Sequence, residues 1–313
     1  MEKQRWEILD AAQLSVLIGV DEAYLRAVAR KPQAHYQRFA LRKRDGTLRH
    51  IFEPEPKLKA VQRWILDNIL ADLPVGAYAK AFRAGASIRD NARFHRRQPV
   101  VISLDIKDFF PSVSLRRIGQ VFADAGCSPA LALLLAKLCC LRTALPQGAP
   151  TSPALSNLVL GPFDATLAAY CRERNLRFTR YADDITVSGD AAAQKASLLQ
   201  TVKRLLLEYG FRINRAKTKV LHRYQRQLVT GIVVNEKMQV PKAYRRRIRQ
   251  EVHYIRRFGL ASHVAREEIR HSRYLQHLLG KIQHVLMVNP GDEKMQAYRR
   301  YIGGLLQREA RPQ

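Results

Sequence analysis

The sequence has few cysteines and few acidic residues, and both shortages narrow the class of protein. Its 313 residues include four cysteines, Cys127, Cys139, Cys140 and Cys171, with no CxxC spacing. This argues against a zinc or disulfide framework, and a vicinal cysteine pair within an apolar helical pattern is typical of core packing. Asp and Glu total 27 against 54 Lys and Arg, which gives a formal net charge of +27. Such a charge exceeds what solubility requires and predicts a polyanionic partner.

Long apolar runs and targeting segments are also missing. The longest run, ALALLLAKLCCL, is interrupted by Lys137 and is too short to span a membrane. The N-terminus, MEKQRWEILDAA, contains acidic residues and no apolar signal core, unlike a secretory or transit peptide. We therefore expect a cytoplasmic protein with no membrane partner. With 47% hydrophobic residues, the chain is long enough for one large or two ordinary domains, and nucleic acid is the expected polyanion.

Apolar spacing predicts alternating helices and hairpins. We expect short helices within 1–35, a hairpin around Asp45-Gly46, a helix with Leu58, Val61, Ile65 and Ile69 on one face, helices at 129–141, 154–175 and 193–210, and basic helices from about 241. Residues 100–106, VVISLDI, form an apolar run of strand length with Asp105 near its end. A buried strand has little reason to end in a carboxylate unless something pairs with it, so Asp105 is a candidate functional residue.

The stretch RYADDITVSG, residues 180–189, places Asp183 and Asp184 side by side in a strand-like segment. Adjacent residues of a strand point to opposite faces, so both carboxylates fit best at the tip of a hairpin. A solvated acidic turn is one interpretation. The other is a metal site: if the strand carrying Asp105 lies beside the hairpin, a shared cation relieves the repulsion among three carboxylates. Two Mg²⁺ ions about 3.5–4 Å apart would then suit nucleotidyl transfer.

Five segments, in this order, resemble the polymerase motifs of reverse transcriptases: SLDIKDFFPSV, LPQGAPTSPALSN, YADD, GFRINRAKTK and LVTGIVVN. Two more, NARFH at 91–95 and Val229-Thr230-Gly231, resemble signatures of the bacterial retron reverse transcriptases. The resemblance covers about residues 36–240. It implies an α+β fold, a right-hand polymerase with fingers, an antiparallel palm sheet and a helical C-terminal thumb. We expect an N-terminal helical extension at 1–35, fingers and palm at 36–236, and a basic thumb at 237–313.

The resemblance assigns catalytic roles to several residues. Asp105, Asp183 and Asp184 match the triad that binds two Mg²⁺ ions, and Lys217 matches a lysine that protonates or neutralises the departing pyrophosphate. Phe110 matches the aromatic gate that excludes a 2′-hydroxyl, with packing beside its neighbouring phenylalanine as the alternative.

Four residues match the rest of the nucleotide pocket. Gln147 and Gly148 match the loop that lies against the nascent base pair, and a helix-breaking linker is the alternative. Lys43 and Arg49 match basic residues that clamp the triphosphate, since Arg and Lys bind phosphate well. Arg42 and Arg44 compete for that role.

Two groups of residues are candidates for RNA binding. Asn91 and His95 lie four positions apart, on one face of a helix, where they either pack structurally or contact RNA. In PKAYRRRIRQEVHYIRRFG, apolar residues at helical spacing, Tyr244, Ile248, Val252, Ile255 and Phe258, are expected to face the protein. The arginines Arg245, Arg246, Arg249 and Arg256 are then expected to bind RNA from the remaining surface.

The resemblance implies an RNA-directed DNA polymerase, a nucleotidyltransferase that copies a structured non-coding RNA of the msr-msd type. Priming from an internal guanosine 2′-hydroxyl would give branched RNA-linked msDNA within an antiphage defence system. The implied partners are this RNA template and primer, dNTPs, the RNA–DNA hybrid product, host RNase H and a separate effector protein, because we expect the chain to leave no room for an RNase H or effector domain. The alternatives are a group II intron or diversity-generating reverse transcriptase, and an inactive RNA-binding scaffold whose function rests on charge alone.

Overall fold

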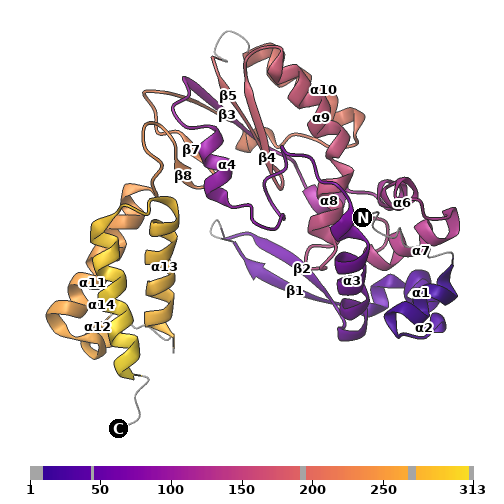
Figure 1. Cartoon of the computed structure of the whole chain (residues 1–313), viewed down its shortest axis with the longest axis horizontal. Coiled ribbons are helices and arrows are strands. Elements are labelled where there is room, and N and C mark those ends of the chain that lie inside the picture. Colours follow the sequence, from indigo (N-terminus) through magenta and orange to yellow (C-terminus); the bar gives the residue numbers. More distant parts are fainter. Residues whose placement is uncertain (1–9, 44–45, 191–194, 267–272, 310–313) are drawn as a thin grey trace, which may run out of the picture. The chain divides into compact units, whose positions relative to one another are not determined.

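The computed structural model describes residues 10–43, 46–190, 195–266 and 273–309 (Figure 1). The chain divides into two compact units, Met1–Ala86 with Ile102–Lys219, and Ser87–Val101 with Val220–Gln313. These boundaries differ from the predicted domains, because residues 87–101 join the C-terminal unit and that unit resumes at Val220 instead of 237. Within the described ranges, the helices are all too short or too polar to cross a membrane.

The first unit begins with helices that confirm the predicted periodicity. Helices α1 (Ala11–Ile18) and α2 (Glu22–Arg30) are followed by α3 (Pro56–Asn68), where the expected stripe is buried. The side chain of Asp10 caps α1 by accepting a hydrogen bond from the backbone of Gln13 at 2.8 Å. Two short 3₁₀ turns, Pro32–His35 and Leu70–Asp72, lie between these elements and their neighbours.

The predicted hairpin consists of β1 (Tyr36–Arg42) and β2 (Leu48–Pro54), which pair antiparallel from Tyr36↔Pro54 to Arg42↔Leu48. Its predicted turn is only partly visible, since Arg44 and Asp45 lie outside the described residues. Strand β2 also contacts α3.

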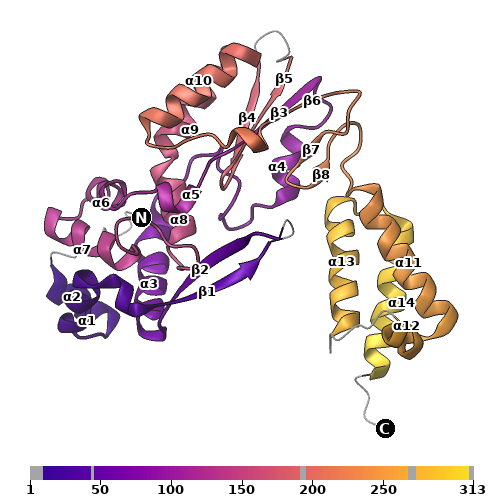
Figure 2. The ribbon, with the colours of Figure 1, turned by 180° about the vertical axis from the view of Figure 1, so that it is seen from behind.

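A four-stranded sheet with the strand order β4-β5-β3-β6 lies among the segments that resemble polymerase motifs. Its strands are β3 (Val100–Asp105), β4 (Arg177–Tyr181), β5 (Asp184–Gly189) and β6 (Lys219–His222), and β4 and β5 pair antiparallel. Figures 1 and 2 both show α9 (Gly161–Arg172) and α10 (Lys195–Glu208) alongside β4 and β5. The aspartates at the ends of β3 and β5 therefore belong to neighbouring strands.

The helix expected at 154–175 is divided into two, and that prediction was wrong. Helix α8 (Ser152–Val159) ends before α9 begins at Gly161, with Pro162 in the first turn of α9. Proline lacks the amide hydrogen that would continue α8, and it is well tolerated in the first turn of a new helix. The remaining helices of this unit are α5 (Phe109–Ser112), α6 (Leu115–Asp124) and α7 (Pro129–Cys139), and Arg215–Lys217 forms a 3₁₀ turn.

The second unit combines α4 (Ile88–Phe94) and the hairpin β7 (Leu228–Val229) and β8 (Ile232–Val233) with four helices. These are α11 (Lys242–Phe258), α12 (Leu260–Arg266), α13 (Tyr274–Val288) and α14 (Glu293–Glu309), seen together in Figure 2. One hydrophobic core links them, with Ile248, Val252 and Ile255 of α11 buried. Tyr244 is half-buried, but Phe258 is 48% exposed, because α11 ends there and Gly259 turns the chain away.

Candidate active site

The β4–β5 hairpin holds two aspartates at its turn, as predicted. The strand register ends at Tyr181↔Asp184, so Ala182 and Asp183 form a two-residue turn and Asp184 begins β5. Ala182 has a positive φ of 56°, a left-handed conformation that is unfavourable for a residue with a side chain. The backbone N–H of Ile106 donates to the carbonyl of Asp183 at 3.0 Å, which places Asp105 next to the turn. Residues 78 positions apart in the sequence thus meet at one edge of the sheet.

Asp105 is buried, and each of its carboxylate oxygens accepts a hydrogen bond from a polar side chain. Lys217 Nζ donates to Asp105 Oδ1 at 2.8 Å, and Asn214 Nδ2 donates to Oδ2 at 3.2 Å. The backbone N–H of Asn214 also donates to the carbonyl of Asp105 at 2.7 Å. The hydrogen bond to Asp105 raises the pKa of Lys217, so this lysine stays protonated at neutral pH. Asn214 is a site residue that the motif resemblance contained in GFRINRAKTK but that was not singled out from the sequence.

The other two carboxylates are held in an environment that disfavours negative charge. Loss of contact with water, then repulsion from Asp105, raises the pKa of Asp183, opposed by Lys217 and Arg49. For Asp184, partial removal from water and repulsion from both other aspartates raise the pKa to about 6. Its surface is still exposed, so solvent screens part of this effect. A nearby cation would favour the charged form of both groups.

The donor chemistry of the three aspartates fits a hard divalent cation, because carboxylate oxygens are the ligands that Mg²⁺ and similar ions prefer. In the described part of the chain, however, no group of three or more His, Cys, Asp and Glu side chains is gathered tightly enough to hold a metal ion. Lys217 is the cation that pairs with Asp105 in this arrangement. The aspartates are adjacent in the fold, while their side chains are not closed around one point.

Phe110 and Phe109 have different surroundings, which bears on the gate prediction. Phe109 is 4% exposed and lies 6.4 Å from the ring of Phe211, as expected of a core residue. Phe110 is only half-buried, and its ring lies 6.4 Å from that of Phe82. Phe82 is 47% exposed and has a φ of 58°, two unusual properties for a large apolar residue. No apolar periodicity in the sequence points to Phe82, which lies in an irregular segment.

The loop that contains Gln147 and Gly148 lies against β2. The backbone N–H of Phe52 donates to the carbonyl of Gln147 at 2.7 Å. Gly148 has a φ of 126°, and a Cβ at this position would lie 2.6 Å from the carbonyl oxygen of Phe52. The close approach to the backbone of β2 therefore explains why residue 148 is a glycine. A linker that only ended a helix would not need this contact.

The basic residues of the β1–β2 hairpin separate by face. Arg49 pairs with Leu41 in the strand register, and Arg42 pairs with Leu48, so Arg49 and Arg42 point to opposite faces. Lys43, the residue after β1, bonds with Thr47 through its backbone N–H at 2.7 Å and follows the face of Arg49. Arg49 opposes the rise in the pKa of Asp183, so its charge acts on the aspartate turn. The alternation favours Lys43 and Arg49 over Arg42 as a pair.

The two segments that resemble retron signatures pack together inside the second unit. Asn91 and His95 are both fully buried. Asn91 Nδ2 donates to Thr230 Oγ1 at 3.5 Å, and Thr230 Oγ1 donates to the carbonyl of Ile88 at 3.3 Å. Burial of both side chains favours the packing interpretation. Direct contact of Asn91 and His95 with RNA stays a prediction.

The four arginines predicted to bind RNA fall into two classes. Arg245 forms an ion pair with the buried Asp292, and Arg256 lies over the rings of Tyr298 and Tyr301 at 5.3 and 4.6 Å. These two stabilise the packing of the helices. Arg246 and Arg249 are exposed, and neither forms an ion pair within the described ranges. They are the better candidates for an RNA surface.

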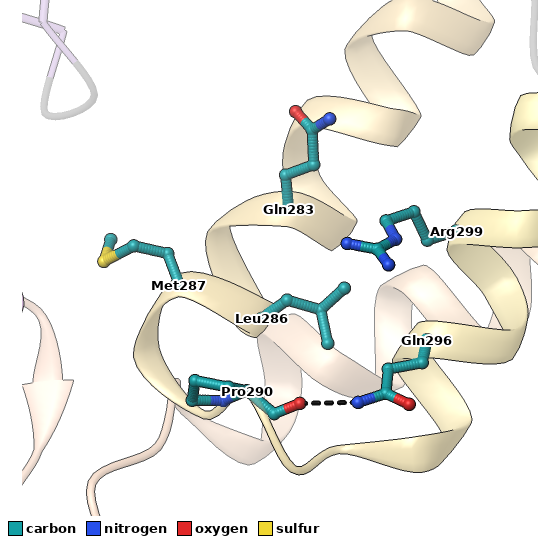
Figure 3. A pocket seen from close by; sticks show the side chains of 6 residues that line it. All are labelled: Gln283, Leu286, Met287, Pro290, Gln296 and Arg299. Atoms are coloured by element: carbon teal, nitrogen blue, oxygen red, sulfur yellow. Dashed lines mark hydrogen bonds between the residues drawn. The ribbon is translucent and has the colours of Figure 1, made fainter.

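A separate cavity of about 330 Å³ lies between α13 and α14 (Figure 3). Its lining combines apolar side chains with two glutamines and one arginine, and Gln296 Nε2 donates to the carbonyl of Pro290 at 2.7 Å. Its residues are Gln283, Leu286, Met287, Pro290, Gln296 and Arg299. This cavity belongs to the second unit, and the three aspartates belong to the first.

Comparison with known proteins agrees with the geometry. Residues 41–256 match the family model described as Reverse transcriptase (RNA-dependent DNA polymerase). The chain is 36% identical to the Retron Mx65 reverse transcriptase of Myxococcus xanthus, over 93% of this chain and 70% of that protein. It is 36% identical to the Retron Mx162 reverse transcriptase of the same organism, over 78% of this chain and 59% of that protein. It is 33% identical to the Retron Ec86 reverse transcriptase of Escherichia coli, over 67% and 66% respectively.

Proposed function

Because the chain belongs to the reverse transcriptase family and, within it, to the retron reverse transcriptases, we propose that it copies a dedicated structured RNA into DNA at Asp105, Asp183 and Asp184. RNA-directed DNA synthesis is the activity of this family. Its fold is that of a right-hand polymerase. The observation that carries the residue assignment is the 3.0 Å backbone hydrogen bond between Ile106 and Asp183. It holds the carboxylates of two distant segments at one edge of the sheet.

Reverse transcriptases generally use divalent metal ions, and we assign two Mg²⁺ ions to the three aspartates. Bound there, the ions would activate the attacking hydroxyl and stabilise charge on the triphosphate. Lys217 contributes a proton or a positive charge to the departing pyrophosphate, since its raised pKa keeps it protonated. The same ammonium pairs with Asp105 and offsets its charge.

The remaining residues of the site select and orient the nucleotide. Arg49 and Lys43, on one face of the hairpin, bind the triphosphate, and the planar guanidinium suits phosphate oxygens. Phe110 fills the space that a 2′-hydroxyl would occupy, which its partial exposure allows. Gln147 and Gly148 support the nascent base pair, from a loop that is bonded to the backbone of β2.

The proposed nucleic-acid substrate is a structured non-coding RNA of the msr-msd type that acts as both template and primer. Exposed arginines of α11, Arg246 and Arg249, contribute to its binding through phosphate and 2′-hydroxyl contacts. Priming from an internal guanosine 2′-hydroxyl would give branched msDNA. An antiphage role, with a separate effector protein and host RNase H, extends this proposal from the retron resemblance.

Primer extension on an RNA template tests the residue assignment. Asp183→Asn keeps the shape of the side chain but removes a carboxylate, so the folded variant should make no detectable DNA in Mg²⁺. Asp190→Asn makes the same change at an exposed aspartate just after β5 and should keep wild-type activity. Normal dNTP incorporation by Asp183→Asn would overturn the assignment of the three aspartates.

A further inference from the structure

A fully buried arginine lies two positions before the first residue of the aspartate turn, Ala182. Arg180 is 0% exposed, and its Nε and Nη2 donate to the two carboxylate oxygens of Asp164 at 2.8 and 2.6 Å. Asp164 of α9 is itself 1% exposed. Removing both charges from water is costly, and apolar residues of similar volume often replace such pairs without loss of stability. Stability alone is therefore a poor explanation for an ion pair at this place.

The third nitrogen of the guanidinium contacts the aspartate turn itself. Arg180 Nη1 donates to the carbonyl of Ala182 at 3.0 Å and to Asn157 Oδ1 at 3.1 Å. Ala182 is the turn residue with a positive φ, and its carbonyl belongs to the peptide bond that leads into Asp183. The guanidinium thus fixes the orientation of the peptide that carries the first aspartate of the turn.

The same cluster also holds the segment that contains Ala81. Asn157 Nδ2 donates to the carbonyl of Ala81 at 2.8 Å, and both groups are buried. The backbone of Arg180 adds two bonds to this segment, accepting from Lys80 at 2.7 Å and donating to Tyr78 at 2.8 Å. The residue after Ala81 is Phe82, whose exposed ring lies 6.4 Å from the ring of Phe110. Hydrogen bonds between the cluster and the backbone of Tyr78, Lys80 and Ala81 therefore hold the segment that carries Phe82. The Phe82 side chain itself is largely exposed.

We propose that the buried cluster of Arg180, Asp164 and Asn157 positions two parts of the nucleotide site together: the aspartate turn, through Ala182, and Phe82 beside Phe110, through Ala81. Phe82 then forms a second wall of the sugar pocket and supports the Phe110 ring. These are positioning residues, and the inference rests on the proposed roles of the aspartates and of Phe110. The guanidinium bonds to Ala182 directly and to Ala81 through Asn157. A change in the cluster should therefore alter catalysis and sugar selection even in a variant that still folds.

Two variants separate the contacts of the cluster. Arg180→Lys keeps the positive charge but lacks the planar fork, so it cannot hold Asp164 and Ala182 at once. Asn157→Ala removes the bond to Ala81 and the bond that Asn157 Oδ1 accepts from Arg180 Nη1, while the Arg180–Asp164 pair and the bond from Arg180 to Ala182 stay in place. The matched control is Arg204→Lys, the same substitution in an exposed ion pair with Glu208 on α10.

For Arg180→Lys we expect kcat for dNTP incorporation to fall by about 100-fold, the loss typical of slightly misplaced reacting groups. Binding of Mn²⁺ to the nucleotide-free protein, followed by electron paramagnetic resonance, should weaken as well. For Asn157→Ala, kcat with dNTPs should stay within about threefold, while the preference for dNTP over rNTP falls by about 10-fold. Phe82→Ala, a change at an exposed side chain, should reproduce the loss of preference.

The outcomes are distinguishable. If Arg180→Lys and Asn157→Ala lower only the melting temperature, with kcat, Mn²⁺ binding and sugar preference per folded molecule equal to those of Arg204→Lys, the cluster is merely structural. If Arg180→Lys does not fold, unchanged sugar preference in both Asn157→Ala and Phe82→Ala refutes the inference by itself. Activity in Asp183→Asn would instead overturn the proposed active site, which is a different failure.

Discussion

Replacement of Gly148 by alanine should disturb the contact between the 146–150 loop and β2. Gly148 has a φ of 126°, and an added Cβ would lie 2.6 Å from Phe52 O and 2.9 Å from Ile51 Cγ2. The closest atom is a backbone carbonyl, which cannot rotate away as a side chain would. Either β2 or the loop must move, and the hydrogen bond from Phe52 to Gln147 lies between them.

Two costs add in this variant. Holding alanine at a φ that non-glycine residues rarely adopt costs about 1–3 kcal/mol. Inserting an atom into a filled contact costs about 1–3 kcal/mol more. We therefore expect Gly148→Ala to lower the free energy of unfolding by about 2–6 kcal/mol, and the melting temperature by about 2–4 °C for each kcal/mol. Because β2 carries Arg49, its displacement should also raise the KM for dNTPs.

Gly126→Ala is the matched control, since Gly126 has a φ of 96° but no atom within 4 Å of an added Cβ. It bears the conformational cost without the clash, and it lies outside the candidate site. The difference in unfolding free energy between the two variants, measured by denaturant titration, should be about 1–3 kcal/mol. Equal destabilisation of both variants, together with an unchanged KM for dNTPs in Gly148→Ala, would refute the reasoning.

Three further predictions concern the gate, the acidic site and the RNA surface. Phe110→Ala should incorporate ribonucleotides while Phe109→Leu should not, and an unchanged rNTP to dNTP ratio in Phe110→Ala would place the gate elsewhere. The folded-state pKa of Asp184, about 6, lies above its ordinary value. The protonated Asp184 side chain therefore contributes to the free energy of unfolding at low pH, and this contribution is lost as pH rises through about 6. Asp184→Asn should accordingly raise the melting temperature of the metal-free protein more at pH 7.5 than at pH 5, and the reverse order would contradict the sign. Arg246→Ala/Arg249→Ala should reduce the salt dependence of RNA binding by about 0.7–0.9 in log-log slope for each lost phosphate contact. That variant should also lose preference for the cognate RNA over an unrelated hairpin of equal length, whereas loss of two exposed arginines elsewhere, Arg26→Ala/Arg63→Ala, should keep it.

The sequence alone predicted those features that depend on neighbouring residues. An apolar run ending at Asp105, a turn at Asp183, and apolar residues at helical spacing in α3 and α11 are local patterns, so the strands, the hairpin and most helices were confirmed. The ordered motifs predicted the polymerase fold. The metal-site interpretation separately placed the strand of Asp105 beside the turn, and the bond between Ile106 and Asp183 confirms that placement. The failure at Pro162 came from reading apolar spacing through a residue that cannot continue a helix.

Only the tertiary structure decided which polar and aromatic side chains are buried and what they contact. Arg180 looks like one basic residue among 54 Lys and Arg in the sequence, yet folding buries it against Asp164 and the turn. The exposure of Phe82 and the burial of Asn91 likewise depend on segments distant in the chain, including Thr230. Periodicity reports which face of an element is apolar, whereas these contacts arise when separate elements pack, and no local pattern encodes their partners.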